Sequence, residues 1–489
     1  MYRTIRVATS KKAIPVIGTF AEDLSRRKHD GIPARLLDRF KRGLATDGFN
    51  AEPGQVQMVD GKLLLCGCGS HEEFTTAKAR ETGARFLREL KRLDVNACVI
   101  QKRSDKDKAF AAMISRALAE GMGLANWRLK GFDGTATKAQ SDTGTLSIDA
   151  TRNASKDAFK EGLLLAEASN ESRRISATPP NVCNPTWMAR QARALARNSN
   201  MTCKVISHTA AGKMGMGGLT NVGVGSNSKP CLIQLDYRPK RISRKAKGAH
   251  LVLVGKTMTY DSGGYSLKIS NSMRGMKYDM CGGSAVFGAM HAIANAKLPI
   301  KVTALLPTAE NMVDSDAYRP DDIITMFNGV TVEVTNTDAE GRLILGDALA
   351  YACKRLKPTA IVDLATLTGG VVVALGNFSA GMWCNDDGFR EQVDHASQDA
   401  DEKTWRLPLW EEHRAFMRSK FADILNSNPK RLAHPIQGAA FLSYFVDEDV
   451  PWAHIDIAGM SNEEQHPVTG HGPTGFGVRM LHSLARNMS

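Results

Sequence analysis

The sequence predicts an α/β protein that is built from two domains. At 489 residues the chain is too long for one ordinary hydrophobic core. Its 43% hydrophobic and 24% charged residues are typical of globular proteins. Short apolar runs alternate with amphipathic stretches in both halves, as strands and helices do in α/β domains. We expect a smaller N-terminal domain at residues 1–152 and a larger C-terminal domain at 153–489, with a mixed sheet flanked by helices.

In the N-terminal domain, strand-like and helix-like segments follow one another at short intervals. Residues 1–7 lack the apolar block of a signal peptide and indicate a first strand instead. Val56–Val59, Lys62–Leu65 and Ala97–Ile100 indicate further strands, and the stretch from Ala77 to Leu93 has the period of a helix. This order predicts an α/β domain, and no group of residues in it suggests chemistry.

A helix at about residues 153–171 is expected to join the two domains. Ala158, Leu163 and Ala168 have helical spacing. The segment 178–181 that follows contains two successive prolines, which cannot continue a helix. The junction between the domains is therefore placed in this region.

The C-terminal domain shows the same alternation over a longer stretch. Its strand candidates are Cys231–Leu235, His250–Val254, Val302–Leu306, Val332–Val334 and Ala360–Leu364. Helical segments fall between them, at Ala285–Asn295 and Leu345–Lys354. The run Leu251–Val254 is apolar throughout, as in a sheet that is covered on both faces. Ligands of such sheets usually bind beyond the carboxyl ends of the strands.

Several classes of protein are disfavoured by the sequence. No run of about eighteen apolar residues predicts a membrane span. The glycine-rich segment 212–228 lacks the Gly-Lys-Ser/Thr ending of a phosphate-binding loop, so its glycines are expected in tight turns. The nine cysteines form no Cys-x-x-Cys pair, which favours reduced thiols and a cytoplasmic location. A transit peptide stays open as an alternative, because no acidic residue precedes Glu22.

The formal net charge of +13 is unevenly placed. Residues 1–42 contain eleven Lys/Arg against four Asp/Glu, and a second basic run occupies residues 238–247. One interpretation is attraction to nucleic acid. We favour the other, solvated helix faces and a charged hairpin loop, because neither segment has interleaved aromatic residues or zinc-finger spacing.

Two clusters of charged residues carry the chemical signal. The first starts directly after a strand candidate with Lys256 and continues through Asp261, Gly263-Gly264 and Lys268 to Asp279. We expect the strand to deliver Lys256 and a short loop to deliver Asp261. The paired glycines would let a ligand approach the backbone closely.

The second cluster is the octapeptide NTDAEGRL at residues 336–343, at the start of a helix. It also follows a strand candidate, so both clusters could line one crevice. Four carboxylates would then meet, and they repel one another unless cations lie between them. Two divalent metals would satisfy them, and oxygen ligands suit zinc, manganese, magnesium or cobalt. No histidine falls in either cluster, which disfavours a histidine-based zinc site.

The basic side chains of the two clusters have different expected roles. Lys256 could bind a cation only as the neutral amine, whereas Lys268 would serve better protonated, aimed at a developing oxyanion. Arg342 cannot act as a general base, but it could hold an anion that does. Each residue alone has a simpler explanation, because Asp338 or Glu340 could cap a helix and single lysines are usually solvated. The two ordered sets together are a stronger signal.

At these residues the sequence closely resembles the leucyl aminopeptidase (cytosol aminopeptidase) family of dimetal peptidases. NTDAEGRL is the family signature, GKTMTYDSGGYSLK at 255–268 resembles a second motif, and MKYDMCGGSAV at 276–286 a third. Further matches are PPN at 179–181, DLATLTGG at 363–370, HIDIAG at 454–459 and TGFGVR at 474–479. The resemblance covers about residues 172–489 well, and the N-terminal part fits in character only.

The resemblance implies two metal ions and assigns a role to twelve residues. One metal would be held by Lys256, Asp261, Asp279 and Glu340. The other would be held by Asp261, Asp338 and Glu340. Lys268 and Arg342 match the catalytic positions, with a bicarbonate ion on Arg342 as general base. The residues that would line the specificity pocket and position the peptide are Met276, Thr366, Leu367, Gly369 and Ala458.

The sequence departs from the family pattern at three places. Thr257 replaces a usual glycine beside Lys256, which adds a side chain near the metals. Gly283-Ser284 stands where alanines are usual, and the loop Lys430–Gln437 is shorter and less glycine-rich. None of these changes removes a ligand, so they bear on substrate preference and metal choice.

The implied function is that of a metalloprotease that removes the N-terminal residue from peptides. A hydroxide bridging the metals, zinc or manganese with cobalt or magnesium as alternatives, would attack the scissile carbonyl. Lys268 and the bicarbonate would assist it. Members of the family form homohexamers, as dimers of trimers. Two rival functions are a nucleic-acid-binding regulator, which rests only on the basic segments, and an inactive structural subunit, which is disfavoured because every ligand position is filled.

Overall fold

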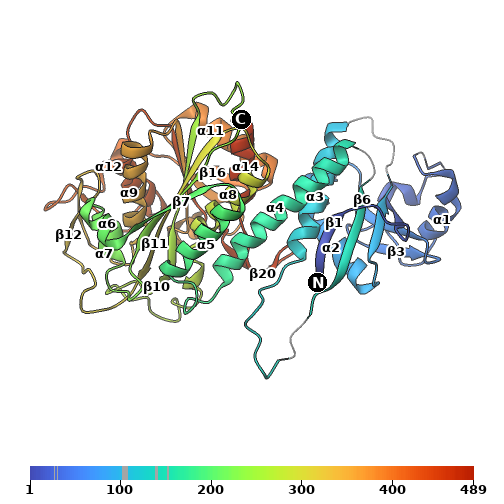
Figure 1. Cartoon of the computed structure of the whole chain (residues 1–489), viewed down its shortest axis with the longest axis horizontal. Helices are drawn as coiled ribbons and strands as arrows, with labels where there is room; N and C mark the ends of the chain where they lie inside the picture. Colours follow the sequence, from blue (N-terminus) through green and yellow to red (C-terminus); the bar gives the residue numbers. More distant parts are fainter. Residues whose placement is uncertain (27, 30, 102–107, 138–140, 151–152) are drawn as a thin grey trace. The chain divides into compact units, whose positions relative to one another are not determined.

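The computed structural model describes residues 1–26, 28–29, 31–101, 108–137, 141–150 and 153–489. Contacts divide the chain into two compact units, each with its own sheet and helices (Figure 1). Unit 1 consists of Met1–Asn170 and Glu464–His471, and unit 2 of Glu171–Glu463 and Gly472–Ser489. The predicted α/β fold class is confirmed. Residues 151 and 152, where the boundary between the domains was predicted, lie outside the described residues.

Unit 1 is built on a six-stranded sheet in the order β1-β6-β5-β2-β4-β3. All neighbouring strands are parallel except β3 and β4. The strands are β1 Tyr2–Val7, β2 Ile14–Phe20, β3 Val56–Val59, β4 Leu63–Gly69, β5 Ala97–Ile100 and β6 Thr143–Ala150. The α-helices are α1 Ala34–Leu44, α2 Thr76–Arg92, α3 Lys108–Ala125 and the first part of α4 Asn153–Ala177. The strands and the helix predicted in this part of the chain are confirmed.

Alternation along β4 explains why this sheet needs helices on both faces. Leu63 and Leu65 are buried in one core together with Phe40 of α1, whereas Leu64 is buried in another with Phe86 of α2. Successive side chains of a strand point to opposite faces, so an apolar run of this kind needs a partner on each side.

Unit 2 contains a nine-stranded mixed sheet in the order β16-β15-β18-β14-β9-β11-β8-β7, with β10 paired to β11. Its strands are β7 Thr202–Ser207, β8 Cys231–Tyr237, β9 His250–Gly255, β10 Thr257–Asp261, β11 Lys301–Asn311, β14 Ala360–Ala365, β15 Ala380–Cys384, β16 Thr404–Arg406 and β18 Trp452–Asp456. A small sheet of the same unit consists of β12 Ile323–Thr325, β13 Thr331–Glu333 and β17 Ile424–Leu425. The strands β19 Asn462–His466 and β20 Gly470–Pro473 pair with each other, and Glu464–His471 within them and between them is counted with unit 1. The mixed sheet predicted for the larger domain is confirmed.

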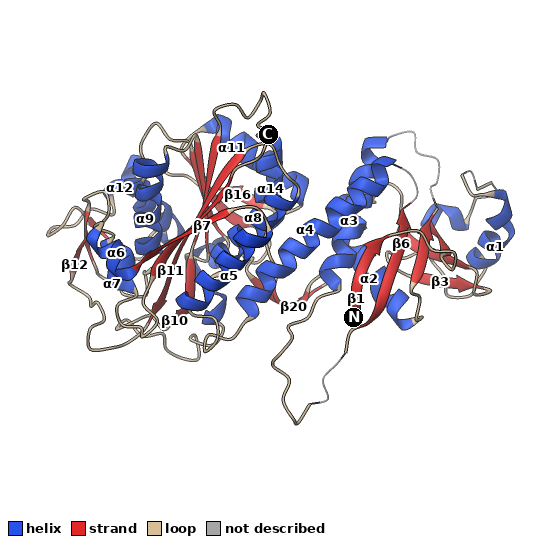
Figure 2. Cartoon of the chain, viewed as in Figure 1, coloured by secondary structure: helices blue, strands red, loops and turns tan. Residues whose placement is uncertain are grey.

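Helices cover both faces of the large sheet, with α8, α11 and α14 in one layer and α6, α7 and α9 in the other (Figure 2). The helices are α5 Pro185–Asn198, α6 His208–Lys213, α7 Gly217–Val222, α8 Cys281–Asn295, α9 Gly341–Tyr351, α10 Gly369–Leu375, α11 Asp387–Ala400, α12 Glu411–Ala415, α13 His434–Leu442 and α14 Val478–Asn487. Within the described ranges, no helix is both long and apolar enough to cross a bilayer.

The basic segment 238–247 is not the hairpin loop that was expected. It joins β8 to β9, but β11 lies between these strands, antiparallel to β8 and parallel to β9. The expectation was wrong because apolar runs that are adjacent in sequence do not show which strand becomes the neighbour in a sheet.

The glycines of segment 212–228 serve close packing as well as turns. Gly215 has a φ of +83° in the turn between α6 and α7, as expected. Gly217 and Gly218, however, open α7, where an added Cβ would lie 2.1 Å from the Thr325 carbonyl oxygen and 2.4 Å from that of Leu343. Only glycine lets α7 approach its neighbours this closely.

Candidate metal centre

The carboxyl ends of neighbouring strands deliver the first cluster and the residues around it. Lys256 follows β9, residues 366–369 follow β14, and Ala458 comes just after β18, three strands that run parallel. Asp261 was expected on a loop, but it is the last residue of β10 and pairs with Asn311 of β11. This edge of the sheet is where ligands of α/β proteins usually bind.

The second cluster approaches from the start of α9. Glu340 occupies the N-cap position of this helix, but its side chain makes no capping hydrogen bond. The carboxylate is buried instead and lies 2.8 Å from Nζ of Lys256. Helix capping, the simpler explanation for this residue, therefore does not account for its orientation.

Three carboxylates from the two clusters converge. One oxygen each of Asp261, Asp338 and Glu340 lie within 4.8 Å of one another. Nζ of Lys268 lies 2.9 Å from Asp261 Oδ2 and 2.5 Å from Asp338 Oδ1. Burial alone would lower the pKa of Lys268, but the charges of Asp261, Glu340 and Asp338 outweigh it and raise that pKa above its usual value.

Lys256 is held at the bottom of the site by three acceptors. Besides Glu340, its Nζ lies 2.9 Å from Asp279 Oδ1 and donates to the Thr366 carbonyl at 2.9 Å. Burial would lower the pKa of Lys256, but the charges of Asp279, Glu340 and Asp261 raise it above its usual value. Two nearby dications would act in the opposite direction.

Asp279 follows the short 3₁₀ helix Met276–Tyr278 and has one unused oxygen. Its Oδ1 accepts a hydrogen bond from Thr366 Oγ1 at 2.8 Å. Its Oδ2 is buried and has no hydrogen-bond partner among the described residues. Burial raises the pKa of Asp279 well above its usual range. A buried carboxylate oxygen without a donor suits a cation as its partner.

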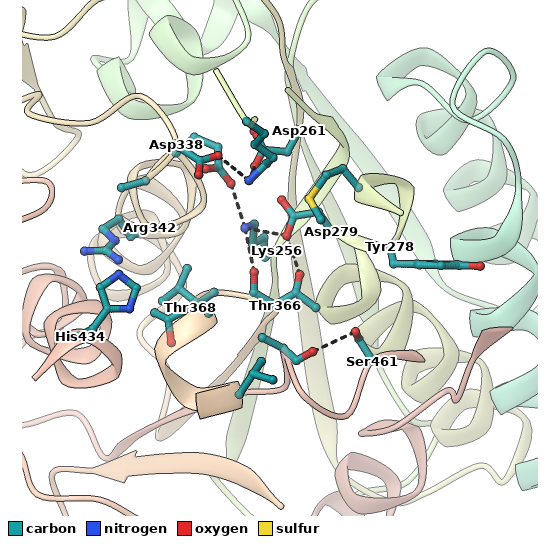
Figure 3. Close-up of a pocket in the computed structure, with 18 of the residues that line it drawn as sticks. Lys256, Asp261, Tyr278, Asp279, Asp338, Arg342, Thr366, Thr368, His434 and Ser461 are labelled. Carbon is teal, nitrogen blue, oxygen red and sulfur yellow. Dashed lines mark hydrogen bonds and ion pairs between the residues drawn. The ribbon is translucent and has the colours of Figure 1, made fainter. Parts of the chain in front are cut away.

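Arg342 lies in the first turn of α9, with its guanidinium beside the ring of His434 (Figure 3). It is buried, and Nη1 donates to the Asn426 carbonyl at 2.7 Å, whereas Nε has no partner among the described residues. Burial lowers the pKa of Arg342 to about 10, so the side chain remains a cation at neutral pH. Such a buried donor can bind an anion.

Asn426 fastens the second cluster in place. Its Oδ1 accepts from the backbone N–H of Thr335 at 2.8 Å, and its Nδ2 donates to the Asn336 carbonyl at 2.6 Å. Together with the bond from Arg342, these contacts fix the segment that carries the acidic residues. Sequence reasoning did not single out Asn426, because its partners lie about ninety positions away.

Asp456 fastens the opposite wall. One oxygen accepts from the backbone N–H groups of Leu367 and Ala458 at 3.0 and 3.2 Å, and the other accepts from Thr368 Oγ1 at 2.7 Å. Two loops that were predicted to contact substrate are therefore held by one buried carboxylate. Asp456 lay within a matched motif, but its role could not be read from the sequence.

A cavity of about 430 Å³ opens over these groups. Every residue predicted for the site lines it: Lys256, Asp261, Lys268, Met276, Asp279, Asp338, Glu340, Arg342, Thr366, Leu367, Gly369 and Ala458. The lining residues that sequence reasoning missed include Tyr278, Thr368, Val372, Arg431, His434 and Ser461. Arg431 and His434 lie in the stretch Lys430–Gln437, whose unusual composition was the available signal. This stretch was expected to be a loop, but α13 begins at His434.

Two departures from the family pattern touch each other. The side chain of Thr257 is fully buried, and a Cβ at Gly283 would lie 2.0 Å from its Oγ1. Gly283 thus provides the space that Thr257 fills. The neighbouring Ser284 hydroxyl hydrogen-bonds those of Ser172 and Ser176, at 3.1 and 2.6 Å.

Comparison of the chain with models of protein families gives two matches. Residues 170–482 match the cytosol aminopeptidase family, catalytic domain, and residues 16–133 match the N-terminal domain of the same family. The chain belongs to the cytosol aminopeptidase family. It is therefore a metal-dependent aminopeptidase, and the family predicted from the sequence motifs is confirmed.

Relatives of known name agree with this assignment. The chain is 43% identical over 483 residues to the probable cytosol aminopeptidase of Chlorobium luteolum, covering 94% of this chain and 92% of that protein. It is 42% identical over 425 residues to the one of Solibacter usitatus, covering 87% and 86%. A solved structure, the bottromycin maturation enzyme BotP in complex with Mn, is 33% identical with a TM-score of 0.83 and covers 97% of this chain and 99% of its own.

Proposed function

We propose that this aminopeptidase removes the N-terminal residue from peptides with two divalent cations, zinc or manganese, in the cavity of unit 2. The observation that carries the proposal is the convergence of Asp261, Asp338 and Glu340 at a distance where cations can be shared. The unpartnered Oδ2 of Asp279 adds a further oxygen. Because the donors are oxygens, cobalt or magnesium are alternatives.

The donor set divides between two ions. One would be held by Lys256 as the neutral amine, with Asp261, Asp279 and Glu340. The other would be held by Asp261, Asp338 and Glu340. When bound, the pair of cations polarises the scissile carbonyl and lowers the pKa of the attacking water.

Lys268 would stabilise the negative charge that develops on the carbonyl oxygen. Its side chain is 15% exposed at the cavity wall, so it can reach a substrate, whereas that of Lys256 is 4% exposed and enclosed by acceptors. A preorganised ammonium aimed at the developing charge lowers the barrier without having to reorient.

Arg342 would hold a bicarbonate ion, which supplies a base for the proton of the attacking water and an acid for the leaving amine. The buried N–H of Nε, which has no acceptor among the described residues, supports an anion there. Met276, Thr366, Leu367, Gly369 and Ala458 would position the peptide, since all of them line the same cavity.

Metal replacement tests the proposal. Enzyme stripped by chelation is reloaded separately with zinc, manganese or cobalt, its metal content is measured by mass spectrometry, and release from a panel of aminoacyl substrates is followed. We expect two ions per chain and release of the N-terminal residue. Failure of every metal to restore activity would overturn the proposal. Asp338→Asn should retain about one ion per chain, since it removes a ligand of one site only.

Two further expectations remain predictions, and one weaker alternative stays open. Assembly as a homohexamer and a cytoplasmic location follow only from the resemblance and from cysteine usage. Binding of nucleic acid rests on the charge of residues 1–42 and 238–247, and Arg27 of the first segment lies outside the described residues.

A further inference from the structure

The active-site cavity continues into a second hollow of different character. This hollow has a volume of about 320 Å³ and shares Asn336, Ser427, Arg431 and His434 with the first cavity. Its other lining residues are Ser266, Thr335, Asn428 and Pro429. In the part of the chain that the structure describes, no acidic side chain lines it, whereas four carboxylates line the first cavity.

Two side chains that can donate hydrogen bonds to an anion, those of Arg431 and His434, lie where the two spaces meet. Arg431 is exposed, and its guanidinium forms no ion pair with any described residue. His434 is half-buried beside Arg342 (Figure 3). Burial, together with the charges of Arg342 and Arg431, lowers the pKa of His434, so its ring is neutral at pH 7 and can donate one hydrogen bond.

The loop that carries Arg431 and leads into α13 at His434 is held in a costly conformation. Arg431 and Ala433 have φ values of +54° and +48°, in the left-handed region that residues other than glycine rarely adopt. Gln437 fixes the loop, because its Oε1 accepts from the Asn428 backbone N–H at 2.9 Å and its Nε2 donates to the Leu432 carbonyl at 2.8 Å. Strain of this kind persists where the surroundings enforce it, and it is concentrated at functional sites.

We propose that Arg431 and His434 bind a carboxylate of the substrate on the leaving side of the scissile bond. The inference rests on the proposed function, which puts the N-terminal residue over the acidic part of the cavity. The rest of the peptide then extends toward Arg431 and His434 and into the second hollow. The carboxylate is either the C-terminus of a dipeptide or the side chain of an acidic second residue. A free guanidinium recognises both.

Two substrate pairs distinguish these sources. X stands for the N-terminal residue that the enzyme releases fastest in the substrate panel described above. The first pair is X-Ala and X-Ala-amide, and the second is X-Asp-amide and X-Asn-amide. A hydrogen bond to a charged group supports a preference of about tenfold in kcat/KM for the charged member of a pair. Preference in the first pair identifies the C-terminus, and preference in the second identifies the side chain. Equal rates within both pairs would overturn the inference.

Matched variants test whether Arg431 is responsible. Arg431→Gln should abolish the preference by raising KM for the charged substrate, and Arg431→Lys should restore part of it. Lys430→Gln is the control, because Lys430 is adjacent and exposed but lines neither space, and its variant should keep the preference. If Arg431→Gln and Lys430→Gln lose the preference to the same extent, the preference comes from the general positive charge of the surface. That result would overturn the proposed carboxylate site.

Failure of the inference can be told apart from failure of the proposed function. If the reloaded enzyme hydrolyses all four substrates without preference, only the carboxylate site is wrong. If it hydrolyses none of them, the aminopeptidase proposal falls and the carboxylate site falls with it.

Discussion

Lys256 and Lys268 show how two residues of the same type come to have different surroundings, which suit the different roles proposed for them. Lys256 sits between two strands, where Asp279, Glu340 and a backbone carbonyl fix its ammonium. Lys268 lies on the loop after β10, and its ammonium contacts the carboxylates of Asp261 and Asp338. The fixed position of Lys256 suits the binding of a metal ion. The more exposed side chain of Lys268 suits contact with a substrate.

Replacing Lys268 by alanine should abolish most turnover and leave the fold intact. Loss of one charge-stabilising donor lowers kcat by about 10²–10³-fold. The measurement is steady-state kinetics on the metal-loaded variant, with circular dichroism as the check on folding. Lys420→Ala, at an exposed position, is the control and should behave as wild type. A near-normal kcat for Lys268→Ala would remove this residue from the mechanism.

The contact between Thr257 and Gly283 should be visible in a double-mutant cycle. Gly283→Ala puts a methyl group 2.0 Å from Thr257 Oγ1 and 2.9 Å from its Cβ, so rotation of the side chain does not relieve the clash. Overpacking of a buried site costs about 1–3 kcal/mol of the free energy of unfolding. In the presence of Thr257→Gly, most of that cost should disappear. Additive effects in denaturant unfolding would contradict this account.

At the element scale, α9 is fastened to two neighbouring segments by one buried acid. Asp347 Oδ2 accepts from the Leu219 backbone N–H of α7, and Oδ1 accepts from that of Phe327, each at 2.8 Å. Burial raises the pKa of Asp347 to about 7, against an ordinary value of 3.8. The helix that carries Glu340 and Arg342 is therefore held by a group that titrates near neutral pH.

The pH dependence of stability should reveal Asp347. Between pH 3.8 and about 7 the unfolded chain releases this proton and the folded chain keeps it, so stability falls as the pH rises and levels off above about 7. In Asp347→Asn, the side-chain NH₂ group faces a backbone N–H where the carboxylate had offered an acceptor. This mismatch lowers the free energy of unfolding by about 1–3 kcal/mol. Urea unfolding should show the larger difference from wild type at pH 5 and the smaller at pH 8. An equal difference at both pH values would contradict the shift.

Elements were predictable where local chemistry decides them, and contacts between distant segments were not. The apolar run of β9 and the spacing of α2 suffice to identify a strand and a helix from the sequence. The sequence also suggested a hairpin at 238–247. It could not show that β11, more than fifty positions away, pairs with β8. His434 was also missed, since only the folded chain brings the start of α13 beside Arg342.

At the scale of the whole molecule, the residues proposed to bind metal lie in unit 2 alone. Cations that bind only the folded state stabilise it by about 2.7 kcal/mol at a hundred times Kd. Chelation should therefore lower the unfolding temperature of unit 2 and leave that of unit 1 in place. Five of the six tryptophans lie in unit 2, so fluorescence follows that unit while calorimetry follows both. A parallel shift of both transitions would show that the units do not unfold separately.

The predicted homohexamer can be tested by mass. Light scattering after size-exclusion chromatography should give six times the 53.1 kDa of one chain at micromolar concentration. A trimer that forms hexamers with rising concentration would support the dimer-of-trimers arrangement. A monomer at all concentrations would contradict the prediction.

The contact between Thr257 and Gly283 also links the residues that these two positions can accept. While position 257 carries threonine, position 283 has no room for a methyl group, because an added Cβ would lie 2.0 Å from Thr257 Oγ1. Glycine at position 257 would remove that side chain and open position 283 to alanine. A library that randomises both positions should therefore return glycine at 283 wherever threonine stands at 257, and a wider choice at 283 wherever glycine stands at 257.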